Sequence, residues 1–192
     1  MQNNNRTMAA AGATLLALAS ACPPAQAFED RALGLYLEGG QSLSGGDHAD
    51  ALSAGVMLPW APRSSMREGP LSFYWDLFAS QWRAPSSSRG EGRRSYSQIG
   101  AIATWRWRFG DGESPWFVEA GIGASVMDRL YHAPSRDFST AFQFTEVLGA
   151  GYSFGTHGQH ELSLRLQHFS NADIKKPNPG EDFVRLRYAY RF

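Results

Sequence analysis

Apolar residues recur at every second position in eight segments of the chain, which is the spacing of a β-strand with two different faces. In one of these segments Leu162, Leu164 and Leu166 alternate with polar residues. The segments lie at residues 31–40, 51–60, 71–82, 98–109, 117–126, 141–154, 161–169 and 184–192. Turn-forming sequences rich in Gly, Pro, Ser and Asp separate them. The pattern therefore predicts an all-β protein.

The alternation alone does not tell which face points outward, and it also permits a soluble exported β-sandwich. The aromatic residues of the apolar faces gather toward the strand ends, as the aromatic girdles of membrane barrels do. They are Trp60, Trp105, Trp107, Phe109, Phe154, Tyr188 and Tyr190. The polar faces mix Gly, Ser and opposite charges, which suits a narrow interior filled with hydrogen-bonded side chains.

The C-terminal segment also favours a membrane barrel, because it alternates and ends on an aromatic residue, Phe192, which resembles the terminal signal of outer-membrane barrels. A closed sheet leaves no backbone edge unpaired in lipid. We therefore expect an eight-stranded antiparallel transmembrane β-barrel of the bacterial outer membrane. If both termini are periplasmic, the loops at residues 44–50, 83–94, 127–137 and 170–181 face outward.

The first 27 residues have the features of a secretory signal. An apolar stretch follows one arginine, and the triplet Ala25-Gln26-Ala27 fits cleavage before Phe28. We expect a cleaved signal peptide over residues 1–27 and a single β-barrel domain over residues 28–192. The alternative, a lipoprotein acylated at Cys22, is less favoured because Ala19 stands where a large aliphatic residue is usual.

The charge balance restricts the partners. The chain has 18 Lys and Arg against 18 Asp and Glu, so it shows no basic footprint for nucleic acid. No cluster of His, Asp and Glu has convincing metal-ligand spacing, and we expect no cofactor. The sequence does not fix the oligomeric state, for which a homodimer is one alternative.

The stretch LRLQHFSNADIKKPNPGEDF, residues 164–183, contains the candidate chemistry. By strand parity His168 and Ser170 share the lipid face of one strand, and Asp182 lies on the same face of the next strand. These residue types suit nucleophilic catalysis, with Ser170 as nucleophile, His168 as general base and the acid orienting the imidazole. Taken singly, each of these residues is also common at a barrel rim or in a turn without a catalytic role.

The segment HFSNADIKKPNPGED resembles the signature of the lipid A 3-O-deacylase (PagL) family, and FVEAGIGAS and LGAGYSF resemble its middle strands. The resemblance implies an outer-membrane esterase that removes the 3-position hydroxyacyl chain of lipid A in the outer leaflet. It assigns His168 as base and Ser170 as nucleophile, and it places Asn171 in the oxyanion hole. A family member has Glu where this chain has Asp182 in an ungapped alignment, so Glu181 stays an alternative acid.

Under this resemblance, Asn178 is a further candidate donor to the oxyanion, and the cations Lys175, Lys176 and Arg129 are candidate contacts for lipid A phosphates. The acyl chains could lie on the aliphatic strand surface below His168. The runner-up function is a non-enzymatic small barrel, an adhesin or structural protein, and a palmitoyl transferase is a third alternative. Acyl-chain preference and latency in native membranes are not readable from the sequence.

Overall fold

A computed structural model describes residues 28, 30–43, 48–60, 69–86 and 92–192. The predicted signal peptide and most of the turn after residue 60 lie outside the described residues. Among those described, no helix has the length and apolar character needed to span a membrane.

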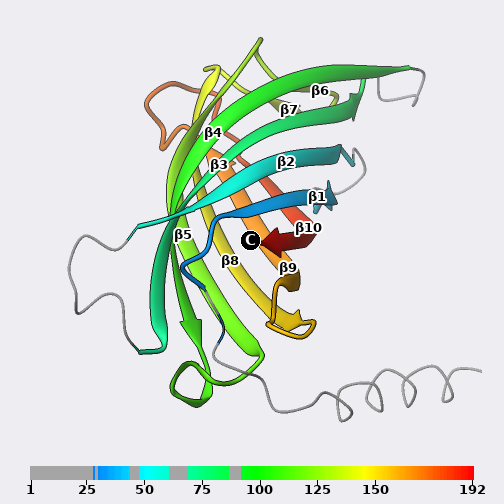
Figure 1. The fold of residues 1–192 in the computed structure, drawn as a ribbon. Helices are drawn as coiled ribbons and strands as arrows, with labels where there is room; N and C mark the ends of the chain where they lie inside the picture. Colours follow the sequence, from blue (N-terminus) through cyan, green and yellow to red (C-terminus); the bar gives the residue numbers. More distant parts are fainter. Residues whose placement is uncertain (1–27, 29, 44–47, 61–68, 87–91) are drawn as a thin grey trace, which may run out of the picture.

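Eight strands close into an antiparallel barrel in the order β1-β10-β9-β8-β5-β4-β3-β2 (Figure 1). They are β1 (Gly34–Ser42), β2 (Asp50–Pro59), β3 (Leu71–Pro85), β4 (Arg93–Arg108), β5 (Trp116–Met127), β8 (Phe142–Phe154), β9 (His160–Ser170) and β10 (Glu181–Arg191). A 3-10 turn, η3 (Gly110–Gly112), joins β4 to β5. The predicted barrel is confirmed.

The structure differs from the prediction in two of the loops. Strand β3 ends at Pro85 and strand β4 begins at Arg93, so both reach into the segment predicted as a loop. They do so because Trp82 and Ala84 extend the buried face there. The predicted loop at residues 127–137 also contains a short hairpin, β6 (His132–Ala133) and β7 (Arg136–Asp137). Both differences lie at the barrel end that holds the segment 171–180, called the loop end below.

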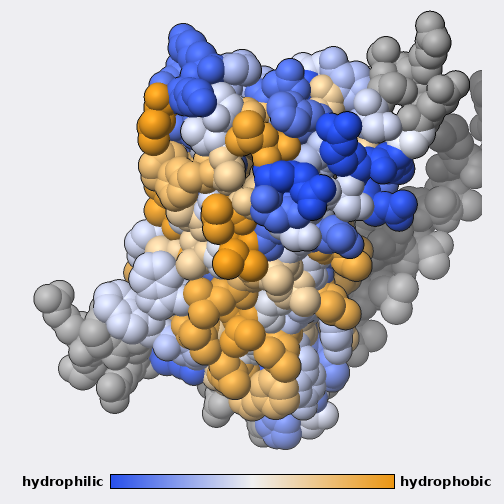
Figure 2. Space-filling view, turned by 90° about the horizontal axis from the view of Figure 1, so that it is seen from above, coloured by the Kyte–Doolittle hydropathy of each residue, from blue (hydrophilic) through white to orange (hydrophobic). Residues whose placement is uncertain are grey.

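The apolar residues of the strands point outward, as predicted. Leu148, Leu164 and Ile99 are each more than half exposed, although they are mid-strand residues of an ordered sheet. Figure 2 shows apolar residues in a broad patch on the barrel wall, with hydrophilic residues gathered toward one end. Such a surface is stable only against lipid.

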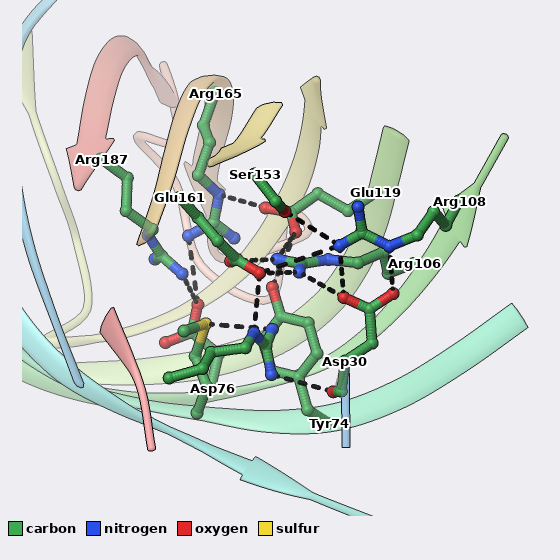
Figure 3. A network of polar contacts seen from close by, with 12 residues as sticks. Asp30, Tyr74, Asp76, Arg106, Arg108, Glu119, Ser153, Glu161, Arg165 and Arg187 are labelled. Carbon is green, nitrogen blue, oxygen red and sulfur yellow. Dashed lines mark hydrogen bonds and ion pairs between the residues drawn. The ribbon is translucent and has the colours of Figure 1, made fainter. Parts of the chain in front are cut away.

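The interior is filled by buried charges of both signs, which also confirms the assignment of the faces. The arginines are Arg106, Arg108, Arg165, Arg185, Arg187 and Arg191, and the acids are Asp30, Glu38, Asp76, Glu119, Glu161 and Glu181. Figure 3 shows most of this network, in which Arg106 Nη1 lies 2.6 Å from Glu161 Oε1 and Arg165 Nη1 lies 3.1 Å from Asp76 Oδ2. Each buried charge thereby has opposite-charge partners, which a low-dielectric interior requires.

Toward the loop end the interior becomes aromatic. Trp82 lies at the centre, with ring centroids of Phe169 at 4.8 Å, Phe183 at 4.5 Å and Tyr131 at 5.5 Å. Phe169 and Phe183 are fully buried and alternate along β9 and β10 with the residues of the predicted site. The packing of these rings therefore fixes, from inside, the wall on which the predicted site stands.

Candidate functional site

The register of β9 and β10 brings two of the predicted residues together on the outer face. His168 and Asp182 are direct cross-strand partners. His168 Nδ1 lies 2.6 Å from Asp182 Oδ1, the length of a strong charge-assisted hydrogen bond. The two side chains are 42% and 57% exposed, so they face the membrane side of the wall and not the lumen.

Ser170 is the last residue of β9 and lies two positions after His168, on the same face. Its partner on β8 is Phe144, whose ring packs edge to face against Phe142 with 5.0 Å between centroids. Ser170 therefore has an imidazole beside it along the strand and an aromatic residue beside it across the sheet.

The alternative acid, Glu181, points to the opposite side of the wall. It is paired with Phe169 in the sheet and is fully buried. Tyr131 Oη donates to Glu181 Oε2 at 3.2 Å, and Arg136 Nε lies 4.0 Å from Oε1. Burial, together with the neighbouring Glu181 carboxylate, raises the pKa of Tyr131. The structure thus brings Asp182 to His168 and places Glu181 inside the barrel.

Asn171 is buried and holds the loop that follows Ser170. Its Nδ2 donates to Lys175 O at 2.8 Å, Ser139 Oγ at 3.0 Å and Thr140 Oγ1 at 3.2 Å. Its backbone N–H donates to Asn178 Oδ1 at 2.9 Å. The segment before β8 therefore fixes the loop beside Ser170, a contact that the sequence did not predict.

Gly180 brings the end of this loop against the imidazole. It has a φ of +65°, and a β-carbon there would lie 2.8 Å from His168 Cε1. Arg136 Nη1 donates to the carbonyls of Gly180 at 2.6 Å and Pro179 at 3.1 Å. The β6–β7 hairpin thereby holds the chain just before Asp182. The sequence shows only that Gly180 precedes an acid, and it gives no sign that Gly180 contacts His168.

Glu146 of β8 is the cross-strand partner of His168 on the side opposite Asp182. It is exposed on the outer face, where a carboxylate is costly in lipid. The outward row across three strands thus reads Glu146, His168, Asp182. The sequence did contain a signal for Glu146, since it interrupts an apolar face, but the pattern could not show what it would adjoin.

The residues predicted to contact the lipid A phosphates lie on different loops. Lys175 and Lys176 are exposed on the loop after Ser170, where Lys176 Nζ lies 3.9 Å from Asp173 Oδ2. Arg129 follows β5, and its Nη2 pairs with Asp128 Oδ2 at 2.9 Å. Asn178 Nδ2 donates to Asp173 Oδ1 at 3.2 Å. The two lysines therefore lie on the loop that follows Ser170, whereas Arg129 lies on another loop and is paired with the adjacent Asp128.

The sequence comparisons agree on one family. The profile of the family described as Lipid A 3-O-deacylase (PagL) matches residues 50–191. Lipid A deacylase PagL of Bordetella bronchiseptica is 36% identical over 182 residues, covering 93% of each chain. Lipid A deacylase PagL of Pseudomonas aeruginosa is 30% identical over 121 residues, covering 62% of this chain and 65% of its own.

Among solved structures, the crystal structure of the outer membrane enzyme PagL superposes with a TM-score of 0.65 at 23% identity. It covers 83% of this chain and 99% of that one, which supports the barrel fold. The family profile spans most of the chain, and the Bordetella relative spans nearly all of it. The chain therefore belongs to the lipid A 3-O-deacylase (PagL) family.

Proposed function

We propose that this protein is an outer-membrane esterase that hydrolyses the ester holding the 3-position hydroxyacyl chain on lipid A. Ser170 is the nucleophile, His168 the base and Asp182 the orienting acid. The observation that carries the proposal is the 2.6 Å contact between His168 and Asp182 on the outward face of a family member, with Ser170 two residues along the same face. The substrate class follows from the family.

The contact to Asp182 determines which imidazole nitrogen can act as base. With Nδ1–H donated to Asp182 Oδ1, the lone pair is on Nε2. Nε2 accepts the Ser170 Oγ proton as Oγ attacks the ester carbonyl, and His168 then gives that proton to the departing sugar oxygen. The resulting acyl-serine is cleaved by water, which His168 deprotonates, and a free hydroxy fatty acid leaves.

The oxyanion of the tetrahedral intermediate needs N–H donors near Ser170. Asn171 Nδ2 already donates to three acceptors, within the loop and in the segment before β8, so its side chain acts as a positioning group. The second N–H of Asn178 Nδ2, beside the one donated to Asp173 Oδ1, and the backbone amides of the loop after Asn171 supply the donors. Ala172 and Asp173 have φ of 51° and 59°, a left-handed turn that concentrates such amides.

An outward-facing site at the extracellular rim suits a substrate that already lies in the outer leaflet. The ester stands at the boundary between headgroup and acyl chains, the level of Ser170 at the end of β9. Lys175 and Lys176 on the adjoining loop bind the glucosamine phosphates. No water-filled cleft is then needed for binding, because lipid A reaches the triad by lateral diffusion.

Mass spectrometry of lipid A tests the function. Expression of the full chain in an outer membrane should remove one hydroxyacyl chain from lipid A, and Ser170→Ala should leave lipid A intact while still folding. Heat-modifiable migration on a gel reports folding of the barrel. A folded wild-type barrel that leaves lipid A unchanged would favour a non-enzymatic barrel, and a gain in mass would indicate acyl transfer.

A further inference from the structure

A short hairpin contacts the loop that joins Ser170 to Asp182. It consists of β6 and β7, lies at the loop end of the barrel, and is followed by β8. Tyr131 and Phe138 flank it, and both are buried, with 5.0 Å between their ring centroids. Phe138 N donates to Tyr131 O at 2.9 Å, which closes the hairpin at its base. The barrel mouth therefore holds the hairpin in place.

Arg136 of β7 connects this hairpin to the end of the loop. Its Nη1 donates to Pro179 O and to Gly180 O, and its Nε lies 4.0 Å from the Glu181 carboxylate. The guanidinium therefore contacts three consecutive residues, and the residue that follows them is Asp182.

These contacts determine the backbone conformation of Gly180. Pro179 O belongs to the peptide plane before Gly180, and Gly180 O belongs to the plane after it. The orientations of these two planes set φ and ψ, so one guanidinium group fixes both angles. Gly180 has a φ of +65°, and a glycine without such contacts populates many other conformations. The hairpin thus supplies a restraint that the loop itself lacks.

The position of the Asp182 carboxylate depends on this restraint. Asp182 is the second residue of β10, so only Glu181 precedes it in the strand. Strand ends open more easily than strand centres. A rotation at Gly180 would change where the chain enters β10 and would move the carboxylate away from His168 Nδ1.

Glu181 explains why the restraining group is a cation. It is fully buried, and a carboxylate in that environment requires hydrogen-bond donors and opposite charge. Tyr131 Oη supplies a donor, and Arg136 supplies positive charge from a partly exposed position. The attraction holds the planar guanidinium in one orientation, from which its N–H groups reach the two carbonyls. Glu181 thereby orients the group that positions Asp182.

The segment after β7 holds the other end of the loop. Ser139 Oγ donates to Lys175 O at 2.6 Å and accepts from Asn171 Nδ2 at 3.0 Å. Asn171 directly follows Ser170. The side of the site with the nucleophile and the side with the acid are therefore attached to one segment, residues 136–140.

We infer that Arg136 is a positioning residue of the deacylase, which sets the Asp182 carboxylate against His168 by fixing both peptide planes of Gly180. The inference rests on the proposed function, because the reaction at Ser170 is what this geometry serves. Arg136 takes no proton and does not touch the ester. Its loss therefore lowers kcat and leaves KM for lipid A almost unchanged.

The first test measures kcat and KM separately, from hydroxy fatty acid release in lipid A vesicles. A displacement of about 1 Å can cost about 10²-fold in rate, so kcat of Arg136→Met should fall about 10²-fold. Arg136→Lys should recover about tenfold of that loss, because an ammonium can donate to carbonyls but lacks the planar fork. A higher KM with unchanged kcat would make Arg136 a substrate contact and overturn the inference.

The double variant Arg136→Met/Glu181→Gln separates positioning from charge compensation. Arg136→Met removes positive charge beside the buried Glu181, and Glu181→Gln removes the charge that needs it. If Arg136 positions Gly180, kcat of the double variant should stay as low as that of Arg136→Met. Recovery of kcat in a double variant with heat-modifiable migration would show that Arg136 only neutralises Glu181, and the inference would fail.

Arg93→Met is the matched control. Arg93 also lies at the loop end, pairs with a carboxylate, Asp50, at 2.7 Å, and donates to the carbonyls of His48 and Arg83. Its strand, β4, is separated from β9 by β5 and β8. Arg93→Met should keep the wild-type kcat, and an equal loss in this variant would mean that any weakening of the rim lowers activity.

A readout independent of catalysis is the NMR signal of the His168 Nδ1 proton in the purified barrel. The short hydrogen bond to Asp182 should place it downfield in wild type and in Arg93→Met, and Arg136→Met should move it upfield. An unchanged signal in Arg136→Met would overturn the inference. Activity that persists in Ser170→Ala would instead reject the proposed catalytic function, whatever the NMR signal shows.

Discussion

Replacing Asp182 by Asn tests the catalytic arrangement most directly. The amide is nearly isosteric with the carboxylate, so the outward position of residue 182 and the β9–β10 pairing are retained. The substitution removes the negative charge that faces His168 Nδ1 at 2.6 Å and lets the amide donate to Nδ1. The imidazole then presents a proton, not a lone pair, to Ser170.

The expected fall in catalytic rate for Asp182→Asn follows from this geometry. At 2.6 Å, the attraction between a carboxylate and an imidazolium is about 1.6 kcal/mol in bulk water and about 6 kcal/mol at an effective dielectric constant of 20. These energies correspond to losses of about 15-fold and about 10⁴-fold in rate. Because the exposed side of the pair adjoins lipid and headgroups, we expect a fall of about 10²-fold to 10³-fold in kcat.

The assay is the rate of hydroxy fatty acid release from lipid A in vesicles, measured by mass spectrometry for Asp182→Asn and Glu181→Gln. Glu181→Gln keeps an acceptor for Tyr131 inside the barrel and should change kcat by less than about tenfold. If Glu181→Gln abolishes activity while Asp182→Asn retains it, the assignment of the acid from the 2.6 Å contact is refuted.

Two further substitutions probe the surroundings of the site, and a third probes the charged interior at the other end of the barrel. Gly180→Ala forces a side chain onto φ +65° and toward His168 Cε1, at a cost of about 1–2 kcal/mol; activity should fall at least about tenfold in a barrel that still shows heat-modifiable migration. Glu146→Gln removes the second carboxylate beside His168 and should lower kcat about tenfold, with unchanged folding, in the same release assay. Asp30→Asn removes the carboxylate that lies 2.6 Å from Arg108 and should lower the free energy of unfolding at pH 7 by about 3 kcal/mol, measured by denaturant unfolding. Burial alone would raise the pKa of Asp30, but Arg108 and Arg106 hold it well below its usual range, so its stabilisation is complete above about pH 4 and is lost on acidification; a wild-type minus mutant difference that does not shrink below pH 4 would contradict this.

Strand parity was sufficient to predict which residues lie on much of the outward face. A period of two assigns each side chain to one side of the wall, so the sequence alone placed His168, Ser170 and Asp182 together. The same parity predicts that Glu181 points inward, as it does. The aromatic residues near the strand ends of the apolar face then indicated that this face meets lipid.

What parity cannot supply is the partner of each residue in the neighbouring strand. Glu146 stood out in the sequence as a polar residue on an apolar face, but only the β8–β9 register places it beside His168. Arg136 lies 44 residues from the Gly180 carbonyl that it binds, in a hairpin too short to produce a periodic signal. Such contacts depend on loop closure across the barrel mouth, which no local pattern encodes.

The charged filling of the barrel bears on the permeability of the membrane that holds it. Arg106, Arg165 and Arg187 reach across the lumen to acids on other strands, so the space that a porin leaves for water is occupied by side chains. Passage of an ion or a small solute would require several buried ion pairs to open together. A cell can therefore insert many copies of this enzyme without adding an open pore for small solutes.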